Sequence, residues 1–223
     1  MFKVAIDGPG GAGKSTISKA AAKALGFVYI DTGAMYRAAA LSCLRQGIDI
    51  KNNHAAAANA VDAIEIDIEY QNDGQHIFLN GEDVTDKIRT PEVSMGASDV
   101  SAIPAVRTRL VAFQRKLADE KNVIMDGRDI GTHVLPDAQV KIFLTADATV
   151  RARRRHAELL EKGVQASFDD VLSDILKRDK NDETRAVSPL VPAADSVLLD
   201  TGNLDFDQSL AAVLSLIQDK FKN

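Results

Sequence analysis

The sequence predicts an α/β fold in which helices flank a parallel sheet and a small antiparallel sheet is inserted. The first observation is a series of short apolar runs with the length and composition of buried strands: residues 2–6, 27–30, 123–125, 140–144 and 196–199. Helical stretches separate these runs, and such alternation is typical of parallel sheets covered by helices on both faces. The second observation is a change of period at residues 64–70, where apolar and polar side chains alternate.

Start and stop signals support the predicted helices. Gly26 and Gly47 follow the helical stretches 14–25 and 34–46, and glycine is common just beyond a helix end. Proline at a first helical turn and a Ser-x-x-Asp capping pattern from Ser167 mark later helix starts. The later helices are expected to begin near residues 91, 104, 148, 167 and 206, and those at 104, 148 and 206 to reach about residues 118, 162 and 221.

The inserted antiparallel sheet is expected between about residues 63 and 92. Residues 64–70 and 77–79 are strand-like, and Asn72-Asp73-Gly74 lies between them as a turn signal. Asn80-Gly81 is a second turn signal after the returning strand. Strands joined by such short turns run antiparallel.

Composition bounds the class of protein. The chain has 223 residues, a net charge of −5, 45% hydrophobic and 26% charged residues, which is the balance of an ordinary globular domain. The acidic balance disfavours binding to nucleic acid polymers. The single cysteine, Cys43, is expected to be a buried small hydrophobe, and its being alone fits a reducing compartment. No signal peptide or bilayer-length apolar run is apparent, so we expect a cytoplasmic protein without membrane association.

The strongest motif is a phosphate-binding loop. It reads Gly8-Pro9-Gly10-Gly11-Ala12-Gly13-Lys14-Ser15 and matches G-x-x-x-x-G-K-[ST] in full, with an apolar strand before it and a helix after it. Glycines let successive backbone N–H groups point at one anion, Lys14 can reach the β- and γ-phosphates, and the Ser15 hydroxyl can ligate Mg²⁺. We expect these eight residues and Thr16 to bind a nucleoside triphosphate, although the motif leaves the reaction open.

Three classes of protein share such a loop. A GTPase switch carries an Asn-Lys-x-Asp element, which does not occur here. An ATPase module has an apolar strand ending in a carboxylate that orders Mg²⁺, and Val123-Ile124-Met125-Asp126 fits that pattern. The next residues, Gly127-Arg128-Asp129, suit a second anionic substrate better than a partner protein. A small-molecule kinase is therefore favoured, and the ATPase module stays open.

The arginines favour the kinase reading as well. Phosphoryl transfer concentrates negative charge between two substrates, and positioned arginines stabilise it. The candidates lie in predicted loops and helix ends: Arg37, Arg107, Arg128, Arg154, Arg178 and Arg185. Arg151 and Arg153, in the arginine-rich helix, are expected instead to be solvated surface residues.

Five segments together resemble the bacterial-type cytidylate kinases. The resemblance runs from residue 2 to about residue 202 and includes Ile6–Ser15 as its first marker. The other markers are Asp31-Thr32-Gly33-Ala34-Met35-Tyr36-Arg37, Gly81–Thr85 with Ile88–Val93, Asp126-Gly127-Arg128-Asp129-Ile130-Gly131-Thr132, and Arg178-Asp179 with Asp182–Arg185. The second, fourth and fifth markers are more specific than the phosphate-binding loop.

The resemblance implies one P-loop kinase domain over residues 1–223. Its core would be a P-loop NTPase-type, five-stranded parallel sheet, with a nucleoside-monophosphate-binding insertion at about 63–92 and a helical lid at about 148–165. The reaction implied is ATP plus CMP or dCMP giving ADP plus CDP or dCDP, with Mg²⁺, by a monomer. The main rival is a kinase of the same fold that acts on another nucleotide or metabolite.

The resemblance also implies site residues. Lys14, Arg128, Arg154 and Arg185 would be catalytic, with Arg154 serving the transition-state charge from the lid. The residues that would bind the acceptor comprise a phosphate set (Arg37, Arg128, Arg185), a cytosine set (Ser98, Arg107, Asp129), a ribose set (Arg178, Asp182) and two residues lining the same pocket (Thr32, Tyr36). A structural alternative stands for three of them: capping or pairing along its helix for Asp182, a surface hydroxyl for Ser98 and a core position for Tyr36.

Overall fold

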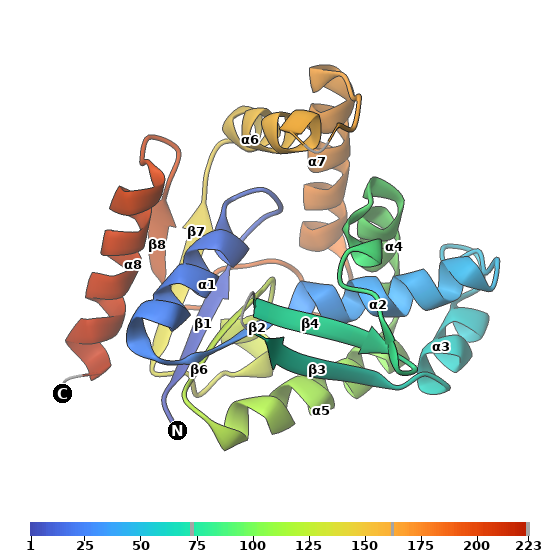
Figure 1. The fold of residues 1–223 in the computed structure, drawn as a ribbon, viewed down its shortest axis with the longest axis horizontal. Coiled ribbons are helices and arrows are strands. Elements are labelled where there is room, and N and C mark those ends of the chain that lie inside the picture. Colours follow the sequence, from blue (N-terminus) through green and yellow to red (C-terminus); the bar gives the residue numbers. More distant parts are fainter. Residues whose placement is uncertain (72–73, 162, 222–223) are drawn as a thin grey trace. The chain divides into compact units, whose positions relative to one another are not determined.

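The computed structural model describes residues 1–71, 74–161 and 163–221 of the chain. These residues form two compact units, each of which is described by itself. The first unit comprises Met1–Tyr29 and Lys121–Asn223, and the second comprises Ile30–Glu120. Figure 1 shows the elements of both units coloured along the chain.

A five-stranded sheet has the strand order β2-β6-β1-β7-β8, and helices flank it, as predicted. Its strands are β1 (Lys3–Asp7), β2 (Val28–Asp31), β6 (Val123–Gly127), β7 (Val140–Thr145) and β8 (Val197–Asp200). β1 pairs in parallel with β6 and β7, so that Ile6 lies opposite Asp126 on one side and Ile142 on the other. Ligands of open parallel sheets bind beyond the carboxyl ends of the strands. The segments that follow β1 and β6 are therefore the first places to look for a site.

The described part of the first unit contains five helical elements besides its strands. They are α1 (Lys14–Leu25), a turn of π-helix η2 (Ile130–Val134), α6 (Ala148–Glu161), α7 (Phe168–Thr184) and α8 (Phe206–Phe221). α1 and α8 pack against each other beside the sheet (Figure 1). Ile17 of α1 and Val213 of α8 join Ile6 and Ile142 in one buried hydrophobic cluster. This apolar packing holds the start of α1 close to the end of β1.

The predicted helix ends are confirmed by their geometry. Gly26 ends α1 with φ 68°, a left-handed conformation that favours glycine. Thr90 and Ser167 cap the helices that follow them, because their hydroxyl oxygens accept from the backbone N–H groups of Val93 and Asp170. These local signals explain why the predicted boundaries agree with the structure to within a few residues.

The second unit contains helices and a small antiparallel sheet. Its elements are α2 (Thr32–Arg45), α3 (His54–Asp62), β3 (Ile66–Gln71), β4 (Gly74–Leu79), β5 (Glu82–Asp83), a 3-10 turn η1 (Lys87–Arg89), α4 (Pro91–Ser101) and α5 (Pro104–Glu120). The sheet order is β3-β4-β5 with antiparallel pairing, as the alternation predicted. Asn80 and Gly81 both have positive φ and form the predicted tight turn. The other predicted turn falls on Asn72 and Asp73, which lie outside the described residues.

Helix α3 was not predicted, whereas the burial of Cys43 was. No element is predicted for residues 51–62, yet α3 forms there, capped by the Asn53 side chain and burying Ala57, Ala60 and Val61. Its alanine-rich face is recognisable only once a neighbouring helix covers it, because alanine alone carries little amphipathic signal. Cys43 of α2 is fully buried, as predicted.

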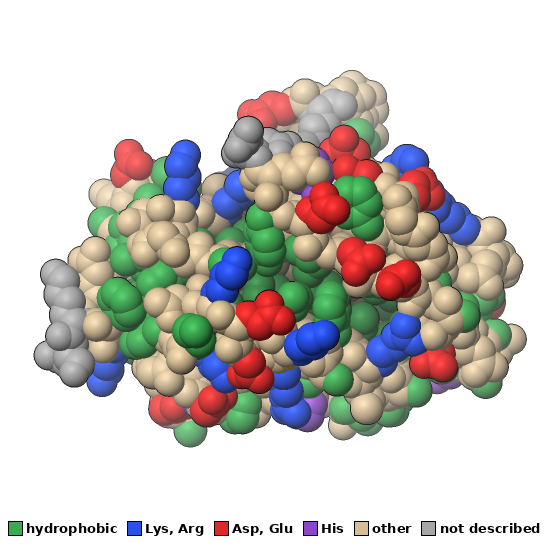
Figure 2. Space-filling model, turned by 60° about the horizontal axis from the view of Figure 1, so that its bottom comes forward, with side chains coloured by type: hydrophobic (Ala, Val, Ile, Leu, Met, Phe, Trp, Pro, Cys, Tyr) green, Lys and Arg blue, Asp and Glu red, His purple; other side chains and the backbone are tan. Residues whose placement is uncertain are grey.

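The surface is mixed in character. On the face shown in Figure 2, Lys and Arg side chains are interspersed with Asp and Glu side chains and with hydrophobic ones. Among the residues described, no helix is both long and apolar enough to cross a membrane.

Candidate active site

The phosphate-binding loop connects β1 to α1, as its sequence context predicted. Gly8 has φ +145°, and a Cβ added there would lie 1.9 Å from the carbonyl oxygen of Leu144. Gly11 and Gly13 also have positive φ. The loop therefore depends on glycine for both its conformation and its close contact with β7. α1 begins at Lys14, so the loop leads into the N-terminal end of a helix, where anions are favoured.

Lys14 lies inside this loop. Its Nζ donates to the carbonyl oxygen of Pro9 at 2.8 Å, and only 6% of the residue is exposed. Burial, together with the charge of Arg128, lowers the pKa of Lys14 to about 7. A phosphate anion at the loop would favour the charged ammonium, so Lys14 is suited to bind one.

Ser15 and Asp126 meet beside the loop. The Ser15 hydroxyl donates to Asp126 Oδ2 at 2.8 Å, and the Tyr29 hydroxyl donates to Asp126 Oδ1 at 3.1 Å. Asp126 is buried, with 3% exposed, at the end of β6. A hydroxyl and a carboxylate side by side are oxygen ligands of the kind that Mg²⁺ prefers, so the residues present fit this ion. Only Ser15 was predicted from the sequence as a metal ligand, although the apolar strand that ends in Asp126 also indicates one.

Arg128 joins the turn after β6 to helix α7. Its Nε donates to Asp182 Oδ2 at 2.8 Å. Burial by itself would raise the pKa of Asp182, but the charge of Arg128 and this hydrogen bond outweigh it, and the pKa is lowered. Asp182 therefore pairs with Arg128 in this structure, whereas the ribose-binding role assigned to it remains a prediction.

Arg128 and Arg178 both reach the phosphate-binding loop. A Cβ added to Gly10 would lie 3.6 Å from Arg128 Nη2 and 3.8 Å from Arg178 Nη1. Two guanidinium groups thus lie next to the backbone that would hold a triphosphate. Guanidinium groups bind phosphate oxygens through charge-assisted hydrogen bonds.

Arg185 and Asp129 are brought together although they are far apart in the sequence. Arg185 Nη2 donates to Asp129 Oδ1 at 3.4 Å, and both side chains are almost completely buried. Arg185 Nε also donates to the carbonyl oxygen of Ser188 at 2.6 Å. Asp129 lies in the turn after β6 and Arg185 directly follows α7. The turn and the end of this helix therefore meet twice, through Arg128 with Asp182 and through Asp129 with Arg185.

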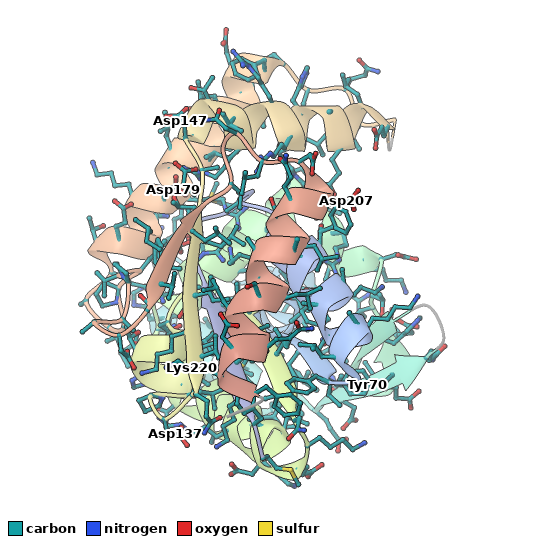
Figure 3. All side chains as sticks on the ribbon, turned by 90° about the vertical axis from the view of Figure 1, so that its left-hand side faces the viewer. Tyr70, Asp137, Asp147, Asp179, Asp207 and Lys220 are labelled. Carbon is teal, nitrogen blue, oxygen red and sulfur yellow. The ribbon has the colours of Figure 1, made fainter. Side chains whose placement is uncertain are left out.

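The prediction that Arg151 is a solvated surface residue is wrong. Only 5% of Arg151 is exposed, and its guanidinium donates to the carbonyl oxygens of Ala146 (2.8 Å) and Gly10 (2.9 Å) and to Asp179 Oδ2 (2.7 Å). Figure 3 labels Asp179 on α7 and Asp147 where β7 passes into α6. Arg151 faces the phosphate-binding loop because the first turn of α6 packs against Gly11, where an added Cβ would lie 3.2 Å from Arg151 Cβ. Charge alone could not reveal which arginine occupies this inward position.

The other arginines of α6 lie differently. Arg153 is exposed, as predicted. Arg154 donates to the carbonyl oxygen of Thr201 at 2.6 Å and to the Thr201 hydroxyl at 3.3 Å. Arg154 is thus held at the segment after β8 in this structure, and its transition-state role remains a prediction.

The remaining predicted residues belong to the second unit. Arg37 Nη2 pairs with Asp31 Oδ2 at 2.8 Å. Burial would raise the pKa of Asp31, but the charges of Arg37 and Arg89 outweigh burial and lower it. Thr32 is buried at the start of α2, next to Asp31, whose side chain accepts from the N–H of Ala34.

Arg107 lies against Tyr36 within the same unit. Its guanidinium carbon is 5.7 Å from the Tyr36 ring centroid, and Nη1 donates to the carbonyl oxygen of Ser101 at 3.3 Å. Arg107 is 2% exposed, which is rare for arginine. Ser98 is also buried, at 9% exposed, rather than a surface hydroxyl. The second unit therefore has buried polar residues of its own. The base- and phosphate-binding roles predicted for residues of this unit remain predictions.

Comparison with known proteins agrees with this geometry. The family model described as cytidylate kinase matches residues 4–219. A cytidylate kinase of Shouchella clausii (strain KSM-K16) is 49% identical over 218 residues, which cover 98% of this chain and 96% of the relative. A cytidylate kinase of Caldicellulosiruptor saccharolyticus (strain ATCC 43494 / DSM 8903 / Tp8T 6331) is 53% identical over 215 residues, covering 96% of this chain and 95% of the relative.

A solved structure is similar to this chain in fold alone. An uncharacterized protein from Eubacterium ventriosum ATCC 27560 has a TM-score of 0.54 at 13% sequence identity, covering 98% of this chain and 99% of that chain. The family match and the full-length relatives carry the assignment: this chain belongs to the cytidylate kinase family.

Proposed function

We propose that this chain transfers the γ-phosphoryl group of ATP to CMP and dCMP, giving CDP and dCDP. The observation that carries the proposal is the approach of Arg128 and Arg178 to Gly10, since it puts two guanidinium groups at the phosphate-binding loop. The Arg128 cation at this place can neutralise charge that develops between donor and acceptor phosphates, whereas Arg178 is proposed to hold the ribose. Family membership supports a cytidine nucleotide as the acceptor.

The donor side is built by the first unit. Residues 8–16 would hold the donor phosphates through the backbone N–H groups of all of them except Pro9, which has none, and Lys14 would contribute charge to the γ-phosphate. Ser15 and Asp126, which already share a hydrogen bond of 2.8 Å, would hold Mg²⁺. When bound, this ion would neutralise phosphate charge.

The acceptor side is assigned by residue. Arg37, Arg128 and Arg185 would bind the monophosphate. Asp129 is chemically suited to cytosine, because a carboxylate accepts from the exocyclic amine that uracil lacks. The remaining acceptor-binding residues proposed are Ser98 and Arg107 for the base, Arg178 and Asp182 for the ribose, and Thr32 and Tyr36 for the pocket wall.

Direct in-line transfer is the proposed mechanism. Substrate positioning and cationic charge then supply catalysis, and the protein needs no nucleophile. Residues 148–165 would act as a lid that excludes water, and residues 63–92 would contribute to monophosphate binding. For Arg154 to act on the transition state, lid closure would have to exchange its hydrogen bonds to Thr201 for phosphate contacts. A cytoplasmic monomer is proposed, and the single cysteine supports the reducing compartment.

The proposal is tested by ADP release from ATP and Mg²⁺ with CMP, dCMP, UMP, AMP, GMP or no acceptor. We expect strong stimulation by CMP and dCMP, and a matched Lys14→Ala sample shows the background. If another monophosphate stimulated best, the chain would be a kinase of different specificity. Turnover without any acceptor would favour an ATPase module, and size-exclusion chromatography with light scattering tests the monomer.

A further inference from the structure

Asp7 is a buried carboxylate to which the proposed mechanism assigns no task. It is the last residue of β1, 4% exposed, and stands directly before the phosphate-binding loop. Its Oδ1 accepts from the N–H of Ile130 at 2.7 Å, and its Oδ2 accepts from the N–H of Gly131 at 2.8 Å. Asp7 thus binds the backbone of the turn that carries Arg128 and Asp129.

The two N–H groups open the helical turn η2. The residue at the capping position of this turn is Asp129, but its side chain makes no capping hydrogen bond. Aspartate at such a position ordinarily accepts from the N–H of the second or third residue of its own helix, which here are Gly131 and Thr132. Asp7 occupies the Gly131 donor, and the Asp129 carboxylate accepts from Arg185 Nη2 instead.

The fit between Asp7 and the turn is close. A Cβ added to Gly131 would lie 3.3 Å from Asp7 Oδ2 and 3.2 Å from Lys141 Cδ, so glycine lets the carboxylate approach the backbone. Burial raises the pKa of Asp7 to about 6 even though both N–H groups lower it. Burying the charged carboxylate therefore lowers the stability of the fold. A neutral side chain could serve a purely structural role without that cost.

We propose that Asp7 is a positioning residue for base selectivity: it caps η2 in place of Asp129 and so keeps the Asp129 carboxylate directed at the cytosine amine. This inference rests on the proposed function. Asp7 itself touches neither the base nor the phosphates in the proposal and acts through Asp129.

The test is the ratio of kcat/KM for CMP to that for UMP in Asp7→Asn. Asparagine has only one acceptor oxygen, and its NH₂ group would face one of the two backbone N–H groups of Ile130 and Gly131. The Asp129 side chain is then expected to turn toward η2 and cap it. The ratio should fall about tenfold to a hundredfold, the loss typical of one hydrogen bond to a charged group, while KM for ATP stays within about twofold. Val213→Ala, a truncation in the core of α8, is the control for destabilisation and should keep the wild-type ratio.

A double-mutant cycle with Asp129→Asn separates the proposal from a structural role. If Asp7 acts through Asp129, the double variant loses no more selectivity than Asp129→Asn alone. Additive losses, or an unchanged ratio in Asp7→Asn, would overturn the proposal. A wild-type enzyme that does not prefer CMP to UMP would overturn the base-reading role of Asp129 and with it this proposal, whereas the absence of stimulation by CMP and dCMP would disprove the proposed function.

A second measurement needs no variant. In the wild-type protein, hydrogen exchange of the Ile130 and Gly131 amides should be slow both without nucleotide and with CMP, because the cap is present in both states. Exchange at the rate of an exposed loop in either state would overturn the proposal, even if Asp7→Asn failed to fold.

Discussion

Arg151 Nη2 donates to Asp179 Oδ2 at 2.7 Å, and the two side chains are only 6% and 12% exposed. The same guanidinium donates to the carbonyl oxygen of Gly10 at 2.9 Å, so the ion pair links α6 and α7 to the phosphate-binding loop. Most surface ion pairs contribute little to stability, whereas loss of one partner from a buried pair leaves an uncompensated charge.

We therefore expect Asp179→Ala to lower the free energy of unfolding by about 3 kcal/mol, because Arg151 would remain buried without its counter-charge. Urea denaturation followed by circular dichroism measures the change. Asp137→Ala is the matched control, since Asp137 pairs with Lys3 but its side chain is 66% exposed. Its removal should cost less than about 1 kcal/mol. Equal effects of the two substitutions would contradict a special role for the buried pair.

Gly8→Ala should lower the free energy of unfolding by more than about 3 kcal/mol. The reason is that its Cβ would lie 1.9 Å from the Leu144 carbonyl oxygen, which belongs to the backbone of a central strand and cannot move cheaply. Gly10→Ala is the control for stability, because its nearest neighbour would be 3.6 Å away, an ordinary contact. Thermal unfolding of both variants checks this, and a stable Gly8→Ala protein would disprove the close approach.

Binding of ATP should be accompanied by proton uptake. The pKa of Lys14 is lowered to about 7 by burial and by Arg128, so the amine is mostly neutral at pH 8 before a nucleotide binds. A bound triphosphate raises that pKa, so about one proton should be taken up at pH 8 and almost none at pH 6. Calorimetry in buffers of different ionisation enthalpy measures the uptake. Lys14→Arg, which stays charged at both pH values, should show none.

Lys14→Ala should reduce kcat by about 10²- to 10³-fold, because the lost ammonium stabilises charge on the transferred phosphoryl group. CMP binding should change little, since Lys14 belongs to the donor side. Steady-state kinetics and calorimetric titration with CMP separate the two effects. Full turnover in this variant would remove Lys14 from the proposed catalytic role.

Local sequence patterns were enough to predict most elements of the fold. The strands are apolar runs. Gly26 ends a helix through its left-handed conformation, and Thr90 and Ser167 begin helices through capping hydrogen bonds to backbone three residues away. α3 was not predicted, because its alanines form a buried face only where other helices cover them. The phosphate-binding loop was predictable for the same local reason, since nine adjacent residues build it.

The sequence by itself determined the α/β class, the antiparallel strands, the phosphate-binding loop and the family resemblance. Only the tertiary structure decided which distant side chains meet: Asp7 with the amides of Ile130 and Gly131, Ser15 with Asp126, and Arg151 with Asp179. The expectation of a surface position for Arg151 failed for this reason. Short-range patterns follow from backbone geometry within a few residues, whereas burial and pairing of charges depend on packing between segments separated by many residues.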